Sequence, residues 1–449
     1  MVLAGCIFPD LSVKGGSKQC KSCEKRGWIV SSLFFPAYNL AWSAALPLLA
    51  LSSRLRQGWR ERVFASRVRR KADLWIQASS AGEAYLACQL LRQCPDLQGK
   101  TALVTCSTTQ GLEVIRKTLK SGALGSKGCR VESGYFPFDM PLIMDKALGA
   151  VHPKVMVILE TELWPGLLGQ CEKRDIPVIL LNGRLSERSY RRYMKFPSLW
   201  RSHAPNKIMA VSEEDARRFK MLYPGIAVDV MKNMKFDRVL LNSAMTGYAP
   251  GAGVVQDLKR SLLVVFASIR KEEESDVLEA IKKLRARAAQ ASIALFPRHM
   301  HRKRAWIKLL KSAGIDFVLR SKINTMNRRG QLILWDVFGE LVQVYNVAAA
   351  VFVGGTLRPC GGQNFLEPLG SGLVPCIGPY WENFSWVGRE IVESGLVTEV
   401  RDVAELVDAL VRDLHMRRPR EEVLNDAAHY IKERQGGTKQ ACREIVKWL

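Results

Sequence analysis

The sequence predicts two α/β domains with parallel sheets, joined by a linker and preceded by an apolar segment. Short apolar runs alternate with longer amphipathic stretches through most of the chain, which is the pattern of strands connected by crossover helices. A small, polar segment containing glycine and proline, residues 241–260, interrupts this alternation and reads as the interdomain linker. The length of 449 residues is enough for two such domains, each with its own core.

An uncharged run near the N-terminus, residues 28–51, is the first of these elements. Its 24 residues are long enough to cross a bilayer, although Pro36 and Pro47 interrupt it. Three interpretations remain open: a spanning helix, a monotopic anchor lying in the membrane interface, or a buried core helix or signal peptide. Basic residues flank both ends, so the charge pattern gives no orientation. We expect residues 28–71 to anchor the chain to a membrane and residues 1–27 to be an N-terminal extension.

The chain is strongly basic, with 67 Lys and Arg against 43 Asp and Glu and a net charge of +24. Such a charge attracts polyanions: nucleic acid, an anionic membrane surface or a phosphorylated substrate. Between Arg54 and Lys71, directly after the apolar run, the chain has eight basic residues and one acidic residue, Glu61. This position favours contact with lipid headgroups, and the sequence contains no recognised nucleic-acid-binding motif. We therefore expect an anionic membrane partner and no nucleic-acid partner.

The first α/β domain is expected over residues 72–240. Its buried strands are predicted by the apolar runs 74–78, 102–106, 154–159, 177–181 and 207–211. The second domain is expected over residues 261–449, with strands predicted at 261–268, 291–296, 316–320, 331–335, 347–355 and 374–377. Ligands of such sheets bind beyond the carboxyl ends of the strands. We therefore expect the functional site in a cleft between the two domains.

The cysteines and histidines predict neither a disulfide framework nor a metal site. The eleven cysteines are scattered and odd in number, which is typical of free thiols in a reducing compartment. Of the six histidines, only His299 and His301 are close in sequence, and no carboxylate spacing resembles a metal site. We expect the protein to require no metal ion and no other cofactor.

Glu83 is the first candidate for catalysis. It ends the turn Ser79-Ser80-Ala81-Gly82-Glu83, which follows the predicted strand 74–78 and precedes a helical stretch. A carboxylate at this position projects into the predicted cleft and could deprotonate an acceptor hydroxyl as a general base. The same residue would equally serve to cap the helix, because the helix dipole favours an acidic side chain at the N-terminus. The spacing alone does not decide between these two roles.

Further charged residues follow later strands of the first domain. Glu160 and Glu162 close an apolar run, and we expect only one of them to enter the cleft, because alternate residues of an extended chain point to opposite faces. Solvation and helix capping are the alternative explanation for this pair. The turn 182–188 offers two guanidinium groups suited to carboxylate or phosphate recognition. Lys235 is another cation near a strand end, just before the linker.

The second domain carries candidate residues for binding a nucleotide. Pro297-Arg298 ends a predicted strand and presents a cation, and Phe338-Gly339-Glu340 resembles a turn at the edge of a ligand site. The segment 353–357 is rich in glycine, which suits an anionic group held at a helix N-terminus. In the block 361–368 that follows, the carboxylate of Glu367 could bind the hydroxyl pair of a ribose.

In their order along the chain, these blocks resemble the family of inverting GT-B glycosyltransferases that add Kdo (3-deoxy-D-manno-octulosonic acid) to lipid A. The resemblance extends from about residue 28 to the C-terminus, and it implies two Rossmann-like domains facing a central cleft, with an N-terminal membrane-anchoring helix. Three blocks depart from the family pattern, at Ile269-Arg270, at Gln363 and at Lys232. The blocks that carry the resemblance are WIQASSAGE, TCSTTQG, FPFDMP, ETELWP, NGRLSERSY, AVSEEDARRF, NMKFD, FPRH, GEL, FVGGTL and GGQNFLEP.

The resemblance implies an enzyme that uses CMP-Kdo as its donor. The acceptor would be a phosphorylated, acylated glucosamine disaccharide, the lipid A precursor, at the cytoplasmic face of the inner membrane. Glu83 would be the base, and Glu160 or Glu162 together with Lys235 would support the transition state. The residues implied to hold CMP are Pro297, Arg298, Phe338, Gly339, Glu340, Asn364, Phe365, Leu366 and Glu367. The number and linkage of the Kdo units, the acyl-chain preference and the oligomeric state do not follow from the sequence.

Two other functions fit parts of the sequence. A different two-domain nucleotide-sugar enzyme of the cell envelope, such as another glycosyltransferase or a sugar epimerase, would share the Glu83 turn and the glycine-rich block. It would not need the apolar N-terminal segment or the block ETELWP. A basic protein that binds a membrane or nucleic acid without catalysis would explain the net charge of +24 but not the ordered motifs.

Overall fold

The computed structural model describes residues 21–63, 71–122, 128–161, 163–239, 258, 262–323 and 330–449, and it divides into two compact units. The first unit ends at Met231, and the last eleven residues, 439–449, return to it. The boundary between the units therefore lies before residue 240, where the sequence predicted it. The segment after Met231 is held in the second unit, because the Asp237 carboxylate accepts hydrogen bonds from the backbone N–H groups of Gly436 (2.6 Å) and Thr438 (2.7 Å). The predicted linker lies outside the described residues apart from residue 258.

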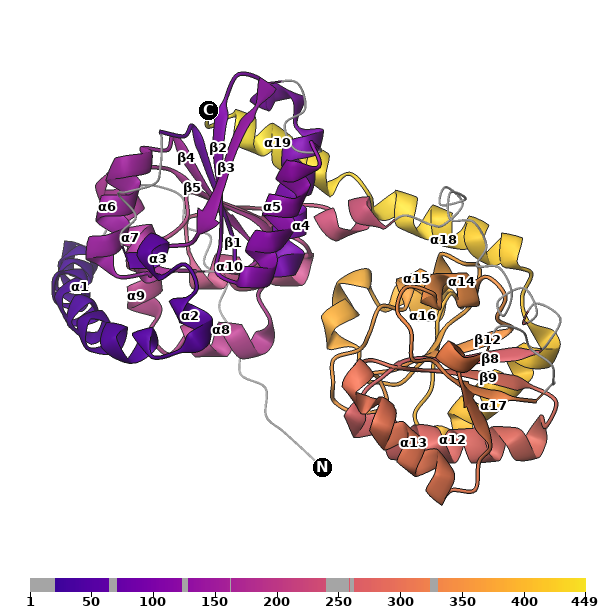
Figure 1. Ribbon diagram of the computed structural model, residues 1–449. Helices are drawn as coiled ribbons and strands as arrows, with labels where there is room; N and C mark the ends of the chain where they lie inside the picture. The colour runs from indigo at the N-terminus through magenta and orange to yellow at the C-terminus, as the bar shows by residue number, and fades with distance from the viewer. Residues whose placement is uncertain are drawn as a thin grey trace, which may run out of the picture. The chain divides into compact units, whose positions relative to one another are not determined.

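The first unit is built on a parallel sheet with strand order β3-β2-β1-β4-β5-β6-β7 among the described residues. The central strands β1 and β4 are buried at every position and apolar apart from Gln77, so the sheet needs helices on both faces. Figure 1 shows α4 and α5 on one face and α6 and α7 on the other. The strands are β1 (Leu74–Ala78), β2 (Thr101–Cys106), β3 (Arg130–Tyr135), β4 (Val155–Leu159), β5 (Val178–Gly183), β6 (Lys207–Ala210) and β7 (Ala227–Val230).

The helices of the first unit follow these strands in turn, as crossover connections require. Several begin at a serine or threonine whose side chain accepts a backbone N–H, as Ser80 does for α4 and Thr108 does for α5. The helices are α4 (Ala81–Gln93), α5 (Thr109–Lys120), α6 (Pro141–Val151), α7 (Pro165–Lys173), α8 (Glu187–Tyr193), α9 (Pro197–Ser202), α10 (Glu213–Leu222) and, from the end of the chain, α19 (Gly437–Val446).

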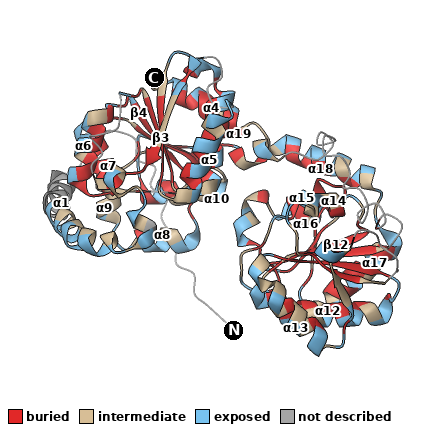
Figure 2. Cartoon of the chain, in the orientation of Figure 1, coloured by how far each residue is buried: buried red, intermediate tan, exposed pale blue. Residues whose placement is uncertain are grey.

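The second unit repeats the architecture with the strand order β10-β11-β9-β8-β12-β13-β14 within the described residues. Residues coloured as buried run along its strands and the inward faces of its helices (Figure 2). The strands are β8 (Leu263–Ile269), β9 (Ser292–Pro297), β10 (Phe317–Leu319), β11 (Leu332–Leu334), β12 (Ala350–Val353), β13 (Cys376–Ile377) and β14 (Thr398–Glu399). The helices are α12 (Glu274–Arg287), α13 (Lys303–Ser312), α14 (Leu341–Tyr345), α15 (Leu366–Leu369), α16 (Glu390–Glu393), α17 (Val403–Met416) and α18 (Arg420–Arg434). Two parallel α/β domains were predicted, and the structure confirms them.

Each strand order reverses direction once in the middle of the sheet. In the first sheet β1 has β2 on one side and β4 on the other, and in the second sheet β8 has β9 on one side and β12 on the other. Connections leave such a pair on opposite faces, which opens a crevice at the carboxyl ends of the two strands. The loops after β1 and β4, and those after β8 and β12, are therefore where ligand-binding residues are expected.

The N-terminal helix α1 (Lys21–Ala50) packs along the first unit. The Tyr38 hydroxyl donates to Asp139 (3.0 Å), the ring of Phe35 lies 4.9 Å from that of His203, and the ring of Trp42 lies 5.6 Å from that of Phe138. Over the described part of the chain, none of the helices combines the length and the apolar character needed to cross a bilayer.

The short helices α2 (Ser53–Arg56) and α3 (Trp59–Val63) begin the predicted basic segment. Arg62 of α3 is buried, donates to the carbonyl of Ser107 (2.8 Å) and lies 4.4 Å from the centre of the Tyr135 ring. Glu61 accepts the backbone N–H of Tyr135 (2.8 Å). This part of the segment therefore belongs to the domain, and Arg62 is not available to a lipid headgroup; residues 64–70 lie outside the described residues.

Asp139 connects α1, the block Phe136–Met140 and the start of α7. Its carboxylate accepts the backbone N–H groups of Gly166 (2.8 Å) and Leu167 (2.7 Å) in addition to the Tyr38 hydroxyl. Gly166 is required at this contact, because a Cβ there would lie 2.2 Å from the Asp139 carbonyl oxygen. Burial raises the pKa of Asp139 to about 7, against the opposing effect of these hydrogen bonds.

Replacing Asp139 by asparagine tests this titration. Because the pKa of Asp139 is higher in the folded protein than the ordinary 3.8, its contribution to stability is present below about pH 4 and is lost as the pH rises to about 7. The loss amounts to about 4 kcal/mol for a shift of about three units. We expect the Tm of the native protein, measured by differential scanning fluorimetry, to fall between pH 4.5 and 7.5 relative to that of Asp139→Asn. Asp145→Asn, at an exposed ion pair on α6, is the control; parallel profiles for the native protein and Asp139→Asn would contradict the assignment.

Candidate active site

Glu83 lies at the carboxyl end of β1, on the first turn of α4. Its side chain is buried, and its two carboxylate oxygens accept the backbone N–H of Ser79 (2.7 Å) and the hydroxyl of Ser80 (2.8 Å). Ser80 in turn accepts the N–H of Glu83 (3.3 Å), so the pair forms a reciprocal cap of the helix. The capping role weighed from the sequence is thus present. Capping does not by itself exclude proton transfer, because two carboxylate oxygens offer about four acceptor positions.

Glu160 follows β4, the neighbour of β1, and has a strained backbone. Its φ is +60°, in the left-handed region that side chains rarely adopt, and Asn182 at the end of β5 has a φ of +56°. The turn is held to β5 by the N–H of Glu160, which donates to Leu181 (2.9 Å), and by the Thr161 hydroxyl, which donates to the Arg184 carbonyl. Such strain at adjoining strand ends is typical of functional sites. Glu162 lies outside the described residues.

Lys235 was predicted with the first domain, but it belongs to the second unit. It lies in the 3-10 helix Met234–Arg238, where Asn233 caps its backbone N–H (3.0 Å). Its ammonium nitrogen lies 6.0 Å from the centre of the Trp386 ring, at the outer limit of a cation–π contact. The structure thus separates Lys235 from Glu83 and Glu160 into a different compact unit.

Arg298 and Glu340 lie beyond the carboxyl ends of β9 and β11 in the second sheet. Pro297 is buried, whereas the Arg298 side chain is exposed and its N–H donates to the Ile269 carbonyl beside it (2.8 Å). Glu340 forms a bidentate pair with Arg320 (2.9 and 2.9 Å) and accepts the indole N–H of Trp335 (3.0 Å). Its carboxylate is therefore held within the domain, and it positions the turn that contains Gly339 and the exposed Phe338.

The block Asn364–Glu367 divides into two pairs of side chains. Asn364 and Glu367 are exposed and joined to each other by a hydrogen bond of 2.9 Å. Phe365 and Leu366 are buried in the hydrophobic core, where Phe365 lies against Trp381 with ring centres 5.8 Å apart. Of the four residues implied to hold CMP, only Asn364 and Glu367 can offer side chains to a ligand.

The glycine-rich turn after β12 already binds an anion, and that anion is Glu273 of the same unit. The Glu273 carboxylate accepts the N–H groups of Gly355, Thr356 (2.7 Å) and Leu357 (2.7 Å), and its side chain is fully buried. Burial raises the pKa of Glu273, and these three N–H groups oppose the rise. The sequence predicts an anionic ligand at this turn. In the structure the turn instead binds the Glu273 carboxylate, which comes from the loop after β8.

Glu273 also fixes the loop that follows the turn. The carbonyl groups of residues 354, 355 and 356 accept the N–H groups of Gln363 (3.1 Å), Gly362 (2.7 Å) and Tyr380 (3.0 Å). The carboxylate therefore orders the turn, and the turn orders the loop that leads to Asn364 and Glu367. Sequence reasoning missed Glu273, because it is the middle residue of three consecutive glutamates and nothing in that run distinguishes it from the other two.

Glu273→Gln is expected to weaken donor binding. The glutamine amide would direct its own N–H groups at the backbone N–H groups of the turn. The hydrogen bonds that are lost involve a charged carboxylate, and such bonds are each worth about 1.5–3 kcal/mol. We expect the KM for the sugar donor to rise by about tenfold or more while the KM for the acceptor stays the same. Glu272→Gln, one residue away and exposed, is the matched control. A donor KM equal to that of the control would overturn this role for Glu273.

No group of three or more His, Cys, Asp or Glu side chains is placed to hold a metal ion among the residues that the structure describes. The expectation that the protein works without a metal stays a prediction.

The chain is similar to proteins that transfer Kdo. Residues 57–238 match the family model described as 3-deoxy-D-manno-octulosonic-acid transferase (kdotransferase). The 3-deoxy-D-manno-octulosonic acid transferase of Haemophilus influenzae is 29% identical over 383 residues, covering 83% of this chain and 86% of that protein. The enzyme of the same description from Bordetella pertussis is 26% identical over 385 residues, covering 84% of this chain and 88% of that protein.

A solved structure supports the fold. A glycosyltransferase from Rickettsia africae matches with a TM-score of 0.52 at 11% identity, covering 84% of this chain and 98% of that one. At this identity the likeness concerns the two-domain fold alone. The family model, in contrast, includes both Glu83 and Glu160 in its matched range and ends after Lys235.

Proposed function

We propose that this chain, which is similar to Kdo transferases, is itself a Kdo transferase and transfers Kdo from CMP-Kdo to a lipid A precursor, a phosphorylated, acylated glucosamine disaccharide. The observation that carries the proposal is the buried carboxylate of Glu83 at the crevice of the first sheet. The ordered loop leading to Asn364 and Glu367, at the crevice of the second sheet, supplies a site for the nucleotide.

In the proposed reaction, Glu83 takes the proton from the acceptor hydroxyl as the oxygen attacks the anomeric carbon of Kdo. The bond from that carbon to the CMP phosphate oxygen breaks, CMP leaves with the electron pair, and the configuration at the carbon inverts. A general base of this kind accelerates a reaction by about 10²–10⁴-fold. Arg298, exposed at the end of β9, and Lys235 provide positive charge for the phosphate of the leaving group. Asn364 and Glu367 would bind the ribose. We propose no metal ion in this step.

Glu83→Gln tests the base. The amide retains an oxygen that can accept the Ser79 N–H, but it cannot take a proton. We expect kcat, measured with freshly generated CMP-Kdo and a tetra-acylated lipid A precursor, to fall by about 10²-fold or more, with CMP affinity and Tm little changed. Glu113→Gln on the neighbouring helix α5 is the control for loss of one carboxylate.

A second variant separates catalysis from capping. Ser80→Ala removes the helix cap and is expected to cost about 1 kcal/mol of stability, yet it leaves the Glu83 carboxylate in place. If Ser80→Ala lost as much kcat as Glu83→Gln, the capping function alone would account for both, and the base would have to be sought elsewhere.

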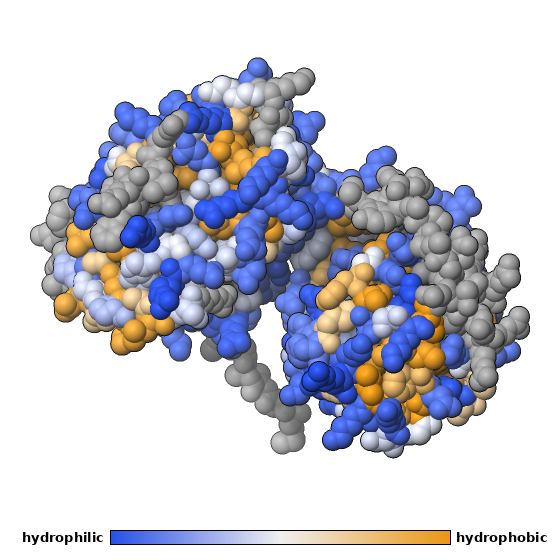
Figure 3. Space-filling model, in the orientation of Figure 1, coloured by the Kyte–Doolittle hydropathy of each residue, from blue (hydrophilic) through white to orange (hydrophobic). Residues whose placement is uncertain are grey.

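We also propose that the side of α1 facing away from the domain lies in the interface of the inner membrane, on its cytoplasmic face. Leu40 and Leu48 of α1, and Leu51 directly after it, are 73%, 70% and 79% exposed. Figure 3 shows apolar surface along the edge of the first unit that α1 forms. An apolar strip of this kind, next to exposed Arg56 and Arg60, fits a monotopic anchor in an anionic leaflet.

The anchor is tested with the triple variant Leu40→Ser, Leu48→Ser, Leu51→Ser. Each leucine that enters the interface contributes about 1.5 kcal/mol, so we expect binding to phosphatidylglycerol vesicles, measured by sedimentation, to weaken at least a hundredfold. Leu51→Ser alone and Met416→Ser form a matched pair, because Met416 is 75% exposed but lies in the second unit. Equal vesicle binding by these two single variants would exclude α1 as the anchor.

A further inference from the structure

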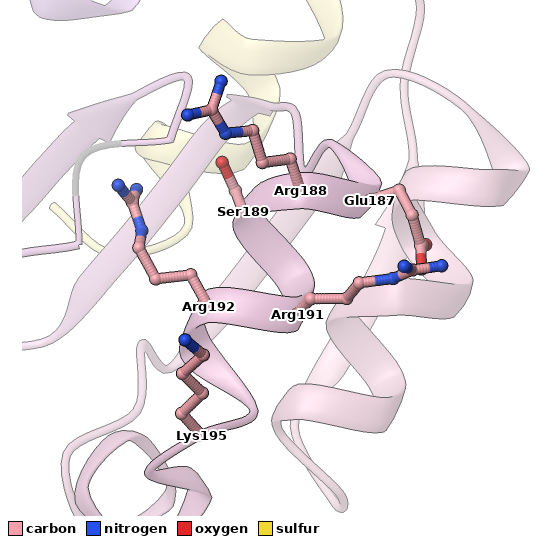
Figure 4. Close-up of a pocket in the computed structure, with 6 residues that line it drawn as sticks. All are labelled: Glu187, Arg188, Ser189, Arg191, Arg192 and Lys195. Atoms are coloured by element: carbon pink, nitrogen blue, oxygen red, sulfur yellow. The ribbon is translucent and has the colours of Figure 1, made fainter.

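A basic hollow opens on α8 in the first unit (Figure 4). Its volume is about 880 Å³, and it is lined by Glu187, Arg188, Ser189, Arg191, Arg192 and Lys195. Arg188 and Arg192 are four residues apart on α8, which brings them to one side of the helix, and Lys195 follows shortly after the helix ends. In Figure 4 these three side chains lie together with Ser189, whereas Arg191 extends the other way, toward Glu187.

The acidic residue of the hollow is already neutralised by other arginines. Glu187 accepts from Arg191 (2.8 Å) and pairs with Arg218 (3.3 Å). Arg188, Arg192 and Lys195 are exposed and have no acidic partner among the described residues. Cations that line one hollow repel one another unless an anion joins them. The hollow therefore has the charge of a site for an anionic group.

Phosphate is the anion that this arrangement fits best. Two guanidinium groups can each donate two parallel hydrogen bonds to phosphate oxygens, and a lysine adds a point charge. The Ser189 hydroxyl, which lies on the same side of the helix, offers a further donor. The hollow is also open to solvent-borne or membrane-borne ligands, because the three cations that line it are exposed.

The position of the hollow relates it to the acceptor side of the site. Helix α8 follows β5, which lies two strands from β1 in the same parallel sheet, so the hollow and Glu83 lie beyond the same carboxyl edge. Two strand spacings separate them by at least roughly 10 Å. On its other side the chain continues from Lys195 through Phe196, which is 67% exposed, into α9, and α9 packs against α1. A group bound here would lie between the proposed base and the proposed membrane anchor.

We propose that Arg188, Arg192 and Lys195 bind a phosphate group of the glycolipid acceptor and so position its hydroxyl at Glu83. This inference rests on the proposed function, and it adds the residues that recognise the phosphorylated acceptor. The lipid headgroups of the membrane carry the same chemical group, so the experiment must separate the two sources of phosphate.

The test uses the full-length triple variant Arg188→Gln, Arg192→Gln, Lys195→Gln in detergent micelles. Loss of charge-assisted hydrogen bonds to phosphate is expected to raise the KM for the phosphorylated precursor by about tenfold or more, with kcat and the KM for CMP-Kdo nearly unchanged. On a precursor whose phosphates have been removed, the native and triple-variant proteins should have the same KM. The control Lys117→Gln, Lys120→Gln, Lys173→Gln makes the same change in net charge at exposed sites on α5 and α7.

Each other outcome has a distinct meaning. If the native protein transfers no Kdo, the proposed function fails; the hollow is then judged by sedimentation of the phosphorylated precursor with native and triple-variant protein, without donor. If transfer occurs but the triple variant behaves as the control, the hollow is not the phosphate site. If the triple variant loses binding to phosphatidylglycerol vesicles yet keeps its KM in micelles, the hollow binds membrane headgroups and the acceptor assignment is overturned.

Discussion

Every strand of both sheets runs parallel to its neighbours, and the rest of the structure depends on this constraint. Parallel strands bring all their carboxyl ends to one edge, and the residues that follow them meet there although they are far apart in the sequence. Glu83, Glu160 and the turn before α8 come to the edge of the first sheet in this way. Arg298, Glu273 and the turn after β12 come to the edge of the second. The strained φ angles of Glu160, Asn182 and Ser268 occur at these same edges.

Three buried carboxylates show how such an edge is held in shape. Asp139 accepts two N–H groups at the start of α7, Glu273 accepts three from the turn after β12, and Glu83 accepts one N–H and one hydroxyl at the start of α4. A buried carboxylate is costly unless it is hydrogen-bonded, and backbone N–H groups in tight turns need acceptors, so each arrangement satisfies both partners.

The large positive charge is distributed between structural and exposed positions. Arg62 and Arg420 are turned into the protein, where Arg420 donates to the carbonyl of Tyr345 (2.9 Å) and burial lowers its pKa to about 10. Arg191 pairs with Glu187, and Arg218 pairs with Glu187 and Glu214. Arg188 and Arg192 on α8, and Lys195 after it, are exposed and have no acidic partner among the described residues. Net charge alone predicts attraction to polyanions, but the choice of ligand is made by those residues that the fold leaves unneutralised.

The sequence alone determined the class of fold, most of the interior strands and the order of the motifs. Runs made almost entirely of apolar residues, such as 74–78 and 155–159, are buried on both faces of the sheet. They can be predicted from the sequence because burial on both faces requires apolar side chains. The edge strands β3, β7 and β14 were not predicted, because β3 is largely polar, β7 and β14 are short, and only pairing with a neighbour defines them. Tertiary structure also decided which motif residues face a ligand. Phe365 and Leu366 enter the core, Lys235 joins the second unit, and Glu273 occupies the turn that its neighbours in sequence do not reach. These outcomes depend on contacts between distant segments, and local spacing contains no information about such contacts.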